Sequence, residues 1–273
     1  MSALQSVDSR SVIIARLRSA GCVFAEDEAR LLMSAAHTVD DLAAMVDRRT
    51  AGEPLEHILG WADFCGLRIA VDPGVFVPRR RTEFLVHQAA ALARRAGLRP
   101  GAVVVELCCG CGAVAAALVA ALRQIEVYAV DIDPRAVCCA RRNLAATGVQ
   151  VYQGDLYQPL PASLRGRVDI LVANAPYVPT AAVELLPAEA RLHEPRLALD
   201  GGRDGLDVLR RVIAMAPHWL AVGSQLLVET SAGQASQLAE TVARSGLIPR
   251  IIGCDELDAT VVAAARPVPH GSV

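Results

Sequence analysis

Lysine is absent from this chain of 273 residues, in which all 27 basic residues are arginines. Lysine forms the Schiff base in pyridoxal-phosphate enzymes and lysine aldolases, and it binds phosphate in the glycine-rich loop of P-loop nucleotide hydrolases. Both chemistries are therefore excluded. The chain also contains no Gly-x-Ser-x-Gly elbow, so a serine hydrolase of that type is unsupported.

Aromatic residues, net charge and long apolar runs are scarce as well. Aromatics make up 4% of the chain and the formal net charge is −2, which disfavours broad electrostatic binding to nucleic acids, although residues 79–81 form a short basic run. The longest apolar run, residues 113–122, is about half as long as a membrane span. Residues 12–15 are too short for the apolar part of a signal peptide. We therefore expect a cytoplasmic protein with reduced thiols, and neither a membrane nor a nucleic acid as its partner.

Three segments differ in the spacing of their apolar residues. Residues 1–54 place apolar side chains at helical intervals, which predicts a small N-terminal helical domain. Residues 55–81 alternate apolar and polar residues between glycines and prolines, which predicts a β-hairpin linker. Residues 82–273 alternate short apolar runs with amphipathic stretches. This last pattern predicts an α/β fold with a doubly wound, mostly parallel sheet.

The expected strands of the large domain are residues 103–107, 127–130, 149–153, 168–173, 225–229, 247–253 and 259–265. The expected helices are residues 82–96, 113–123, 134–146, 206–216 and 234–245. Thr82 is the expected N-cap of the first of these helices. No helix separates the last two strands, so we expect them to pair antiparallel at one edge of the sheet.

A glycine-rich turn follows the first expected strand. Gly110 and Gly112 let the backbone approach a ligand at the carboxyl end of a strand, where open α/β sheets bind ligands. Ala115 replaces the third glycine of the NAD-binding pattern, which disfavours NAD. Asp131 ends the second expected strand, where a carboxylate can bind ribose hydroxyls. Asp155 follows the third expected strand, and its carboxylate could accept a hydrogen bond from an adenine amino group. Together they predict a nucleoside site, while a helix cap and a simple loop remain the alternative roles for the two acids.

The tetrapeptide 174–177 directly follows the buried strand 168–173. The side-chain oxygen of Asn174 and the backbone carbonyl of Ala175 can each accept one N–H of a planar amino or amide group. Pro176 restricts the backbone of the residue before it, and the ring of Tyr177 can pack on the plane of the bound group. The motif predicts a pocket that presents an amide or an exocyclic amine to the nucleoside ligand.

Five of the eight cysteines lie in two clusters: Cys108, Cys109, Cys111, Cys138 and Cys139. Their spacing differs from the CxxC pairs of tetrahedral zinc sites. Cysteine often packs as a small buried residue. We therefore expect a packing role and no metal, with a reactive thiol beside the ligand as the alternative.

Taken together, these motifs resemble the class I S-adenosylmethionine-dependent methyltransferases. More narrowly, they resemble the protein-(glutamine-N5) methyltransferases that modify the Gly-Gly-Gln loop of peptide chain release factors. The resemblance covers nearly the whole chain, in residues 52–54, 58–60, 73–79, 82–83, 106–112, 131–134, 154–156, 174–177, 194–199, 201–202 and 204–206. It implies a Rossmann-like methyltransferase domain at 82–273 and a substrate-recognition role for the helical domain at 1–54.

The resemblance also implies roles for individual residues. The catalytic residues would be Asn174, Ala175, Pro176 and Tyr177, which hold the glutamine amide. The residues that would bind S-adenosyl-L-methionine are Glu106, Leu107, Cys108, Cys109, Gly110, Gly112, Asp131, Ile132, Asp155, Leu156 and Asn174. Glu194 and Arg196 would order the loop on the substrate side, or form a structural salt bridge. The implied partner is a protein substrate, a peptide chain release factor.

The chain departs from the family pattern at three places. Ala175 stands where the family has the first of two prolines, Arg80 and Arg81 replace a proline and an acidic residue, and cysteines replace small polar residues in the glycine-rich turn. Two alternatives therefore stay open. One is an amino-methyltransferase of the N6-adenine type, which shares the Asn-x-Pro-aromatic pocket, although this chain lacks a large basic target-recognition insert. The other is a non-catalytic S-adenosylmethionine-binding protein.

Overall fold

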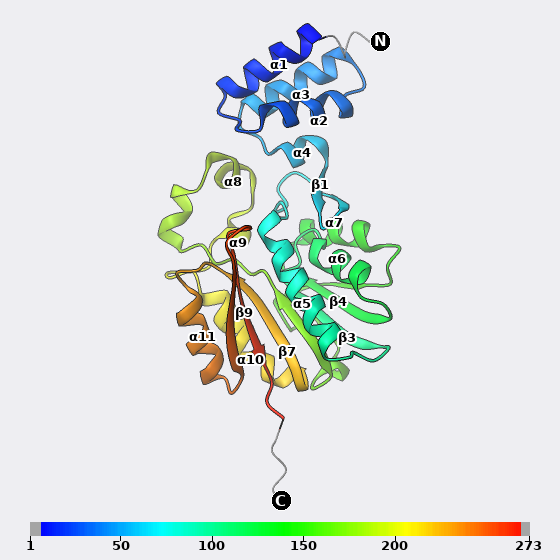
Figure 1. Cartoon of the computed structure of the whole chain (residues 1–273), viewed down its shortest axis with the longest axis vertical. Helices are drawn as coiled ribbons and strands as arrows, with labels where there is room; N and C mark the ends of the chain where they lie inside the picture. The colour runs from blue at the N-terminus through cyan, green and yellow to red at the C-terminus, as the bar shows by residue number, and fades with distance from the viewer. Residues whose placement is uncertain (1–6, 269–273) are drawn as a thin grey trace, which may run out of the picture.

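The computed structural model describes residues 7–268, and a bundle of helices forms one end of the molecule (Figure 1). The helices of this bundle are α1 (Val7–Ser19), α2 (Ala25–Ala35), α3 (Val39–Thr50) and α4 (Leu55–Leu59). Leu17, Leu32 and Val46 are buried in its core, and Ile58 of α4 packs against them. The helical core therefore extends four residues beyond position 54.

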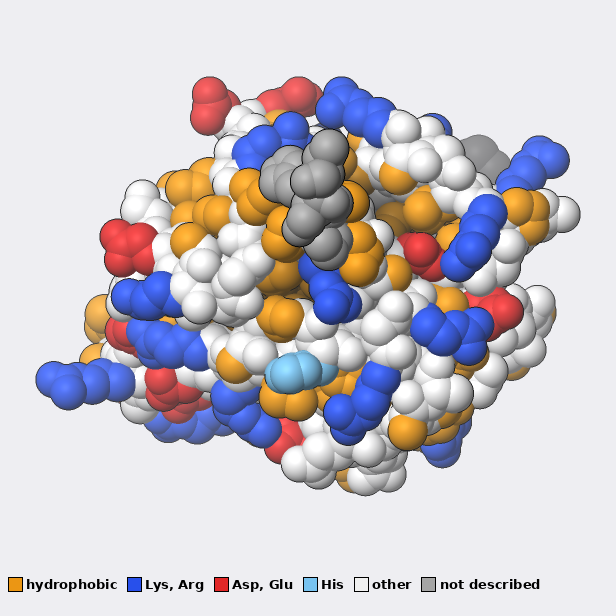
Figure 2. All heavy atoms as spheres, turned by 90° about the horizontal axis from the view of Figure 1, so that it is seen from below, with side chains coloured by type: hydrophobic (Ala, Val, Ile, Leu, Met, Phe, Trp, Pro, Cys, Tyr) orange, Lys and Arg blue, Asp and Glu red, His pale blue; other side chains and the backbone are white. Residues whose placement is uncertain are grey.

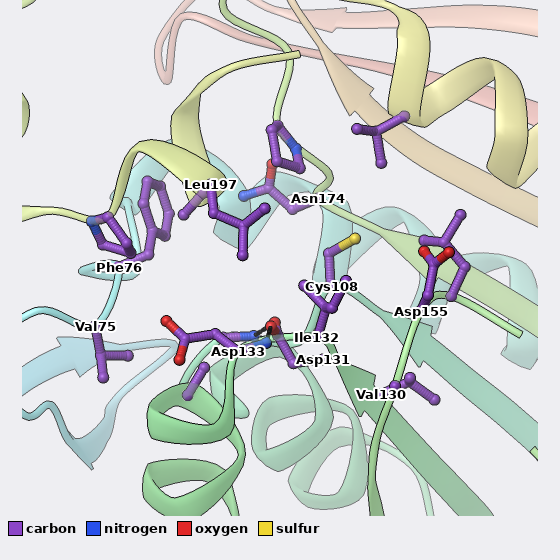
Figure 3. Close-up of a pocket in the computed structure, with 18 of the residues that line it drawn as sticks. Val75, Phe76, Cys108, Val130, Asp131, Ile132, Asp133, Asp155, Asn174 and Leu197 are labelled. Atoms are coloured by element: carbon purple, nitrogen blue, oxygen red, sulfur yellow. Dashed lines mark hydrogen bonds between the residues drawn. The ribbon is translucent and has the colours of Figure 1, made fainter. Parts of the chain in front are cut away.

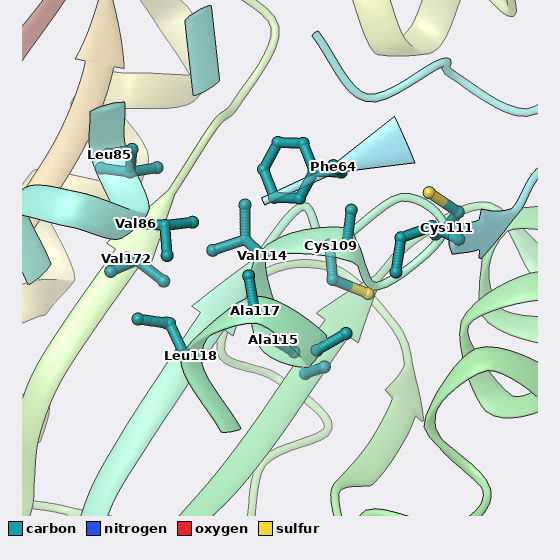
Figure 4. Close-up of a cluster of buried hydrophobic side chains, with 14 of the residues drawn as sticks. Phe64, Leu85, Val86, Cys109, Cys111, Val114, Ala115, Ala117, Leu118 and Val172 are labelled. Atoms are coloured by element: carbon teal, nitrogen blue, oxygen red, sulfur yellow. The ribbon is translucent and has the colours of Figure 1, made fainter. Parts of the chain in front are cut away.

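A two-stranded antiparallel hairpin connects the helical bundle to the large domain. Its strands are β1 (Trp61–Phe64) and β2 (Leu67–Ala70). Phe64 is fully buried among side chains of the large domain, close to Val114 (Figure 4). Asn143 of the large domain donates to the Ala70 carbonyl at 2.8 Å and accepts from the Ala70 N–H at 2.9 Å. The predicted hairpin is thus present, and it is fixed to the large domain.

A seven-stranded sheet forms the centre of the large domain. Its strands are β3 (Ala102–Leu107), β4 (Ile125–Asp131), β5 (Gln150–Gln153), β6 (Val168–Ala173), β7 (Leu220–Thr230), β8 (Ile248–Cys254) and β9 (Ala259–Ala265). Their order is β5-β4-β3-β6-β7-β9-β8, and β9 alone runs antiparallel to its neighbours. The predicted fold class is confirmed. The last two strands pair antiparallel as expected, with β9 inserted between β7 and β8.

Five long helices cover the two faces of the sheet (Figure 1). They are α5 (Glu83–Arg95), α6 (Ala113–Ala121), α7 (Pro134–Leu144), α10 (Asp207–Trp219) and α11 (Ala235–Arg244). Alternate residues of each strand point to opposite faces, so Val104 packs against α5 and α6 while Val103 and Val105 pack on the side of α10. Two separate apolar layers therefore hold the carboxyl ends of the parallel strands in place.

Thr82 does not cap α5, contrary to the sequence-based expectation. The helix begins at Glu83, and Thr82 lies in a preceding 3₁₀ turn, η2 (Arg80–Thr82). Its backbone is already helical, with φ −68° and ψ −17°, and its side chain makes no cap hydrogen bond. An N-cap requires a non-helical backbone, so the hydroxyl is free for another role.

The segment between β6 and α10 folds into short helices that the sequence did not predict. These are η4 (Thr180–Leu185), α8 (Ala188–His193) and α9 (Arg196–Leu199), and a further turn, η3 (Ala162–Leu164), precedes β6. In Figure 1, α8 lies between the helical bundle and the end of the sheet. Arg49 of α3 donates to Glu28 at 2.6 Å and to Glu189 of α8 at 3.1 Å. This arginine links the bundle to the segment beside the sheet.

Candidate active site

A cavity that is partly open to solvent lies at the carboxyl ends of β3 to β6. Figure 3 shows Phe76 and Asp155 on opposite sides of it, with Asp131 and Ile132 between them. The predicted cofactor residues that line the cavity are Cys108, Gly110, Asp131, Ile132, Asp155, Leu156 and Asn174. Residues from four different strand ends are therefore brought together as expected.

The other four predicted cofactor residues lie behind the wall of this cavity. Leu107 and Cys109 are buried in the two apolar layers. Glu106 accepts a hydrogen bond from the N–H of Ala115, which fixes the start of α6. A Cβ on Gly112 would lie 2.8 Å from the Leu144 side chain, so only glycine lets α6 and α7 pack this closely. These residues shape the glycine-rich turn.

Asp131 is held in place by the backbone around it. Its Oδ2 accepts from the N–H of Gly110 at 2.8 Å, and its Oδ1 accepts from the N–H of Asp133 at 2.9 Å. Burial raises the pKa of Asp131, and these hydrogen bonds oppose that rise. Each carboxylate oxygen keeps a further acceptor position, which suits two ribose hydroxyls. Asp133 caps α7 by accepting from the N–H of Arg135, so the helix-cap role belongs to Asp133.

Asp155 pairs with an arginine that the sequence analysis did not single out. Its Oδ2 accepts from Nη2 of Arg211, a residue of α10 that also lines the cavity. Next to it, Leu156 has a left-handed backbone with φ 49°, and Cys108 on the facing turn has φ 57°. Such conformations cost energy for residues other than glycine and cluster at functional sites. Both strained residues line the cavity.

A second cavity adjoins the first and is lined by all four predicted catalytic residues: Asn174, Ala175, Pro176 and Tyr177. Phe76, Asn174, Pro176 and Ala198 line both cavities. A ligand in the first cavity and a second ligand in this one would therefore meet beside Asn174. We refer to the first as the donor cavity and to the second as the acceptor cavity.

The side chain of Asn174 is oriented by Thr82. Its Nδ2 donates to Oγ1 of Thr82 at 3.1 Å, which leaves Oδ1 as the acceptor for a ligand. The hydroxyl of Tyr177 donates to Oε1 of Glu229, the penultimate residue of β7, at 3.1 Å. Burial, together with the neighbouring Glu229, raises the pKa of Tyr177. The sequence analysis missed both Thr82 and Glu229 as members of the site.

Two glycines let a loop pack tightly against the backbone of the tetrapeptide. A Cβ on Gly201 would lie 2.6 Å from the carbonyl oxygen of Pro176, and one on Gly205 would lie 2.2 Å from that of Tyr177. Gln234 donates to the same Tyr177 carbonyl at 3.0 Å. Residues that are distant in sequence thus hold this tetrapeptide rigidly.

Glu194 orders the loop that carries Phe76. Its Oε1 accepts from the N–H of Val77 at 3.1 Å, and its Oε2 accepts from Arg79 at 2.5 Å. The Arg79 guanidinium in turn lies 4.9 Å from the centre of the Phe76 ring. Arg196, the other residue expected to order this side, instead pairs with Asp200 just beyond its own helix at 3.1 Å and with Glu184 at 3.6 Å.

The cysteines beside the donor cavity pack as apolar residues. Figure 4 shows Cys109 and Cys111 among buried aliphatic side chains. Burial raises the pKa of Cys108, which lines the cavity, and of its two neighbours, so their thiolate forms are disfavoured. Among residues 7–268, no three His, Cys, Asp or Glu side chains are grouped so that they could hold a metal ion. The packing interpretation agrees with this arrangement.

Comparison with known proteins identifies the family. Residues 66–203 match the model of the methyltransferase small domain. The chain is 41% identical over 212 residues to a release factor glutamine methyltransferase of Geobacter sulfurreducens, covering 76% of this chain and 72% of the relative. It is 34% identical over 263 residues to that of Bradyrhizobium diazoefficiens, covering 89% of both chains. The chain belongs to the release factor glutamine methyltransferase family. The resemblance inferred from the motifs is confirmed, and the protein is a methyltransferase.

Another relative has a different named substrate. The chain is 38% identical over 201 residues to a 4-amino-L-phenylalanine/4-methylamino-L-phenylalanine methyltransferase of Streptomyces pristinaespiralis, covering 71% of this chain and 66% of the relative. Both named substrate groups carry a nitrogen next to a planar system.

Proposed function

We propose that this chain transfers the methyl group of S-adenosylmethionine to the side-chain amide nitrogen of a glutamine in a peptide chain release factor. The observation that carries the proposal is the position of Asn174 where the two cavities meet, with its amide N–H engaged by Thr82. Its free oxygen suits an acceptor that brings N–H groups. Family membership favours a glutamine as that acceptor.

The residues of the donor cavity fit S-adenosylmethionine, which supplies an electrophilic methyl group on a positively charged sulfur. Asp131 keeps acceptor positions for the ribose hydroxyls. Ile132 is 47% exposed although it is apolar, and Leu156 lies on the same cavity, so both offer surface to an adenine ring. The carboxylate of Asp155 is the acceptor available for the adenine amino group.

The acceptor cavity would catalyse the reaction mainly by alignment. The side-chain oxygen of Asn174 and the carbonyl of Ala175 would each accept one N–H of the amide, and Tyr177 would pack on its plane. Alignment of this kind can lower a barrier by roughly 7–11 kcal/mol in favourable cases. The new N–C bond forms as the S–C bond breaks, and the nitrogen then loses one proton to water. An obligatory general base is not required, because the nitrogen becomes acidic once it is methylated.

A protein loop suits the acceptor side of the molecule. The acceptor cavity opens to solvent, and α8 on its edge contacts the helical bundle through Arg49 and Glu189. We propose the bundle, residues 1–54, as the region that recognises the release factor. Translation takes place in the cytoplasm, so this substrate would place the enzyme there. Within the described residues, no helix is both long and apolar enough to cross a membrane.

Nucleic acid is the less favoured substrate. Figure 2 views the end opposite to the helical bundle and shows arginines spread over this face, with acidic and apolar side chains between them. In the basic run at 79–81, Arg79 is paired with Glu194, and Arg81 lines the acceptor cavity. Neither feature forms the continuous basic surface that a large nucleic acid needs.

A labelled-methyl assay tests the substrate. Purified chain is incubated with methyl-labelled S-adenosylmethionine and, in parallel, a release factor, the same factor with the glutamine of its Gly-Gly-Gln loop changed to alanine, DNA, RNA, and 4-amino-phenylalanine. Label in the intact release factor alone is the expected result. Label in the alanine variant, in nucleic acid or in the free amino acid instead would overturn the substrate assignment.

A further inference from the structure

Glu229 is a buried carboxyl group with no role in the function described above. It is 2% exposed, and it lines the acceptor cavity near the carboxyl end of β7. Its Oε1 accepts from Tyr177, and its Oε2 has no hydrogen-bond partner among the described residues. Burying a carboxyl group is costly unless its oxygens are used. Its position beside the acceptor therefore calls for an explanation.

The hydroxyl of Thr82 provides the missing link between Glu229 and Asn174. A threonine hydroxyl has one proton to donate, and its oxygen already accepts from Nδ2 of Asn174. The Thr82 hydroxyl also stabilises the ionised Glu229 carboxyl, since it lowers the pKa of Glu229 against the opposing effect of burial. The Oε2 of Glu229, unpartnered among the described residues, can take the proton of Thr82.

An ionised carboxylate can accept hydrogen bonds but cannot donate them. With Glu229 at one end, the chain of bonds has one direction, from Asn174 to Thr82 and from Thr82 to Glu229. We propose that Glu229 is a positioning residue for methyl transfer: through Thr82 it keeps the N–H of Asn174 turned away from the acceptor and its oxygen turned toward it. This inference rests on the proposed function, because it assumes an acceptor with N–H groups.

The variant Glu229→Gln tests the direction of these bonds with almost no change in shape. The introduced amide can donate to Thr82, and Thr82 can then donate to the oxygen of Asn174. The Asn174 amide would turn, and its N–H groups would face the N–H groups of the acceptor. We expect kcat to fall at least about tenfold, because the acceptor would lose its alignment with the methyl donor. Affinity for S-adenosylmethionine should stay within about threefold.

Glu229→Asp separates this role from simple packing. Aspartate is a poorer match in size than glutamine, but its carboxylate can still only accept. If Glu229 sets the direction of the bonds, Glu229→Asp keeps more activity than Glu229→Gln. If the side chain only fills space, the order is reversed, and the proposal is overturned. It is likewise overturned if Glu229→Gln keeps a kcat within about threefold of the wild type.

Thr82→Val and a double variant test the route through the hydroxyl. Thr82→Val should lower kcat. Adding Glu229→Gln to it should lower kcat little further, since both changes break the same chain of hydrogen bonds. Fully additive losses would contradict the route. Ser224→Ala is the control. Ser224 carries a buried hydroxyl on β7, the strand that also carries Glu229, and it lies about 16 Å from Glu229 along that strand. It should keep the wild-type kcat.

The dependence of kcat on pH gives a second readout. Burial raises the pKa of Glu229, while the hydroxyls of Thr82 and Tyr177 and the charge of Arg81 oppose this rise. A protonated Glu229 can donate and so loses its control over the direction of the bonds. The kcat of the wild type should therefore fall as pH falls through this raised pKa. Glu229→Gln should lack that decline, and an unchanged profile in this variant would contradict the proposal.

A measurement without any acceptor separates this inference from the proposed function. In nuclear magnetic resonance of the wild type, the Nδ2 protons of Asn174 should exchange slowly with water, because they are bonded to Thr82. Exchange should become faster in Thr82→Val and in Glu229→Gln, and remain slow in Ser224→Ala. Unchanged exchange in the first two variants overturns the inference. Failure to methylate release factors, with the exchange pattern intact, overturns the proposed substrate only.

Discussion

The donor cavity and the acceptor cavity share Asn174 but are assembled differently. Most donor-cavity residues lie at the end of a parallel strand or within a few residues of it, as Cys108, Asp131 and Asp155 do. The acceptor cavity joins segments that are far apart in the chain, such as Arg79 with Glu194, which are 115 residues apart. The comparison indicates that short local motifs build the cofactor side, whereas long-range side-chain contacts build the side that chooses the substrate.

Asn174→Ala should have the largest effect on turnover and should separate the two cavities. The variant removes the only side-chain acceptor that the tetrapeptide offers to the amide. Loss of one preorganised group at a reacting centre typically costs about 10²–10³ in kcat. Calorimetry should show nearly unchanged binding of S-adenosylmethionine, because Asp131 and Asp155 remain. Full turnover in Asn174→Ala would show that the acceptor amide is held elsewhere.

Asp131→Ala should have the opposite signature. Hydrogen bonds to a charged group contribute about 1.5–3 kcal/mol each, so loss of both ribose contacts should lower the affinity for S-adenosylmethionine at least about 100-fold. Turnover at saturating S-adenosylmethionine should fall much less, because the acceptor side is intact. Asn174→Ala and Asp131→Ala are controls for each other. If both variants lose mainly kcat, or both lose mainly affinity for S-adenosylmethionine, the division into a donor cavity and an acceptor cavity is wrong.

Sequence reasoning reached the donor side because its signals are local. Val103, Val105 and their neighbours form a nearly continuous apolar run, as a strand buried on both faces does, and glycines and acids that follow such strands indicate a ligand site. The four donor-side residues that stay behind the cavity wall, such as Glu106, occupy the same motif. A motif gives the position of a turn but not the direction of each side chain.

The acceptor side was predicted in its tetrapeptide and, through the family resemblance, in Glu194, but its other contacts were missed. The pattern before Glu83 is typical of a helix cap, yet Thr82 bonds Asn174, 92 residues away. Glu229 appears in the sequence as the end of an ordinary strand, and its burial depends on Tyr177 and on the 3₁₀ turn that packs beside it. Local rules fail most where a residue serves a distant site. The short helices between β6 and α10 have too few residues for a periodic signal.

Glu194→Gln should weaken the acceptor side by a moderate amount. Glu194 has a fully buried side chain and holds both Val77 and Arg79, so the loop with Phe76 should loosen. We expect a loss of about 1–3 kcal/mol in stability and a higher KM for the release factor, with a smaller change for S-adenosylmethionine. Glu184→Gln is the control, since this exposed side chain has only weak pairs with Arg191 and Arg196, and its replacement should cost at most about 1 kcal/mol of stability. If Glu194→Gln and Glu184→Gln change stability and the KM for the release factor equally, Glu194 does not support the acceptor cavity.

Ala175→Pro should have the smallest effect. Ala175 precedes Pro176, which already favours an extended backbone, and among the described residues its N–H donates to no protein acceptor. The carbonyl proposed to hold the amide is kept, so kcat should stay within about twofold, and stability should rise by at most about 1 kcal/mol through a more restricted unfolded chain. Ala173→Pro is the contrasting control, because Ala173 is buried in the ladder between β3 and β7 and proline there removes a strand hydrogen bond. Measurements of kcat and of thermal unfolding for both variants test these expectations. A tenfold loss in Ala175→Pro would mean that the N–H at this position contacts the acceptor, and that the acceptor cavity uses the backbone more than its side chains suggest.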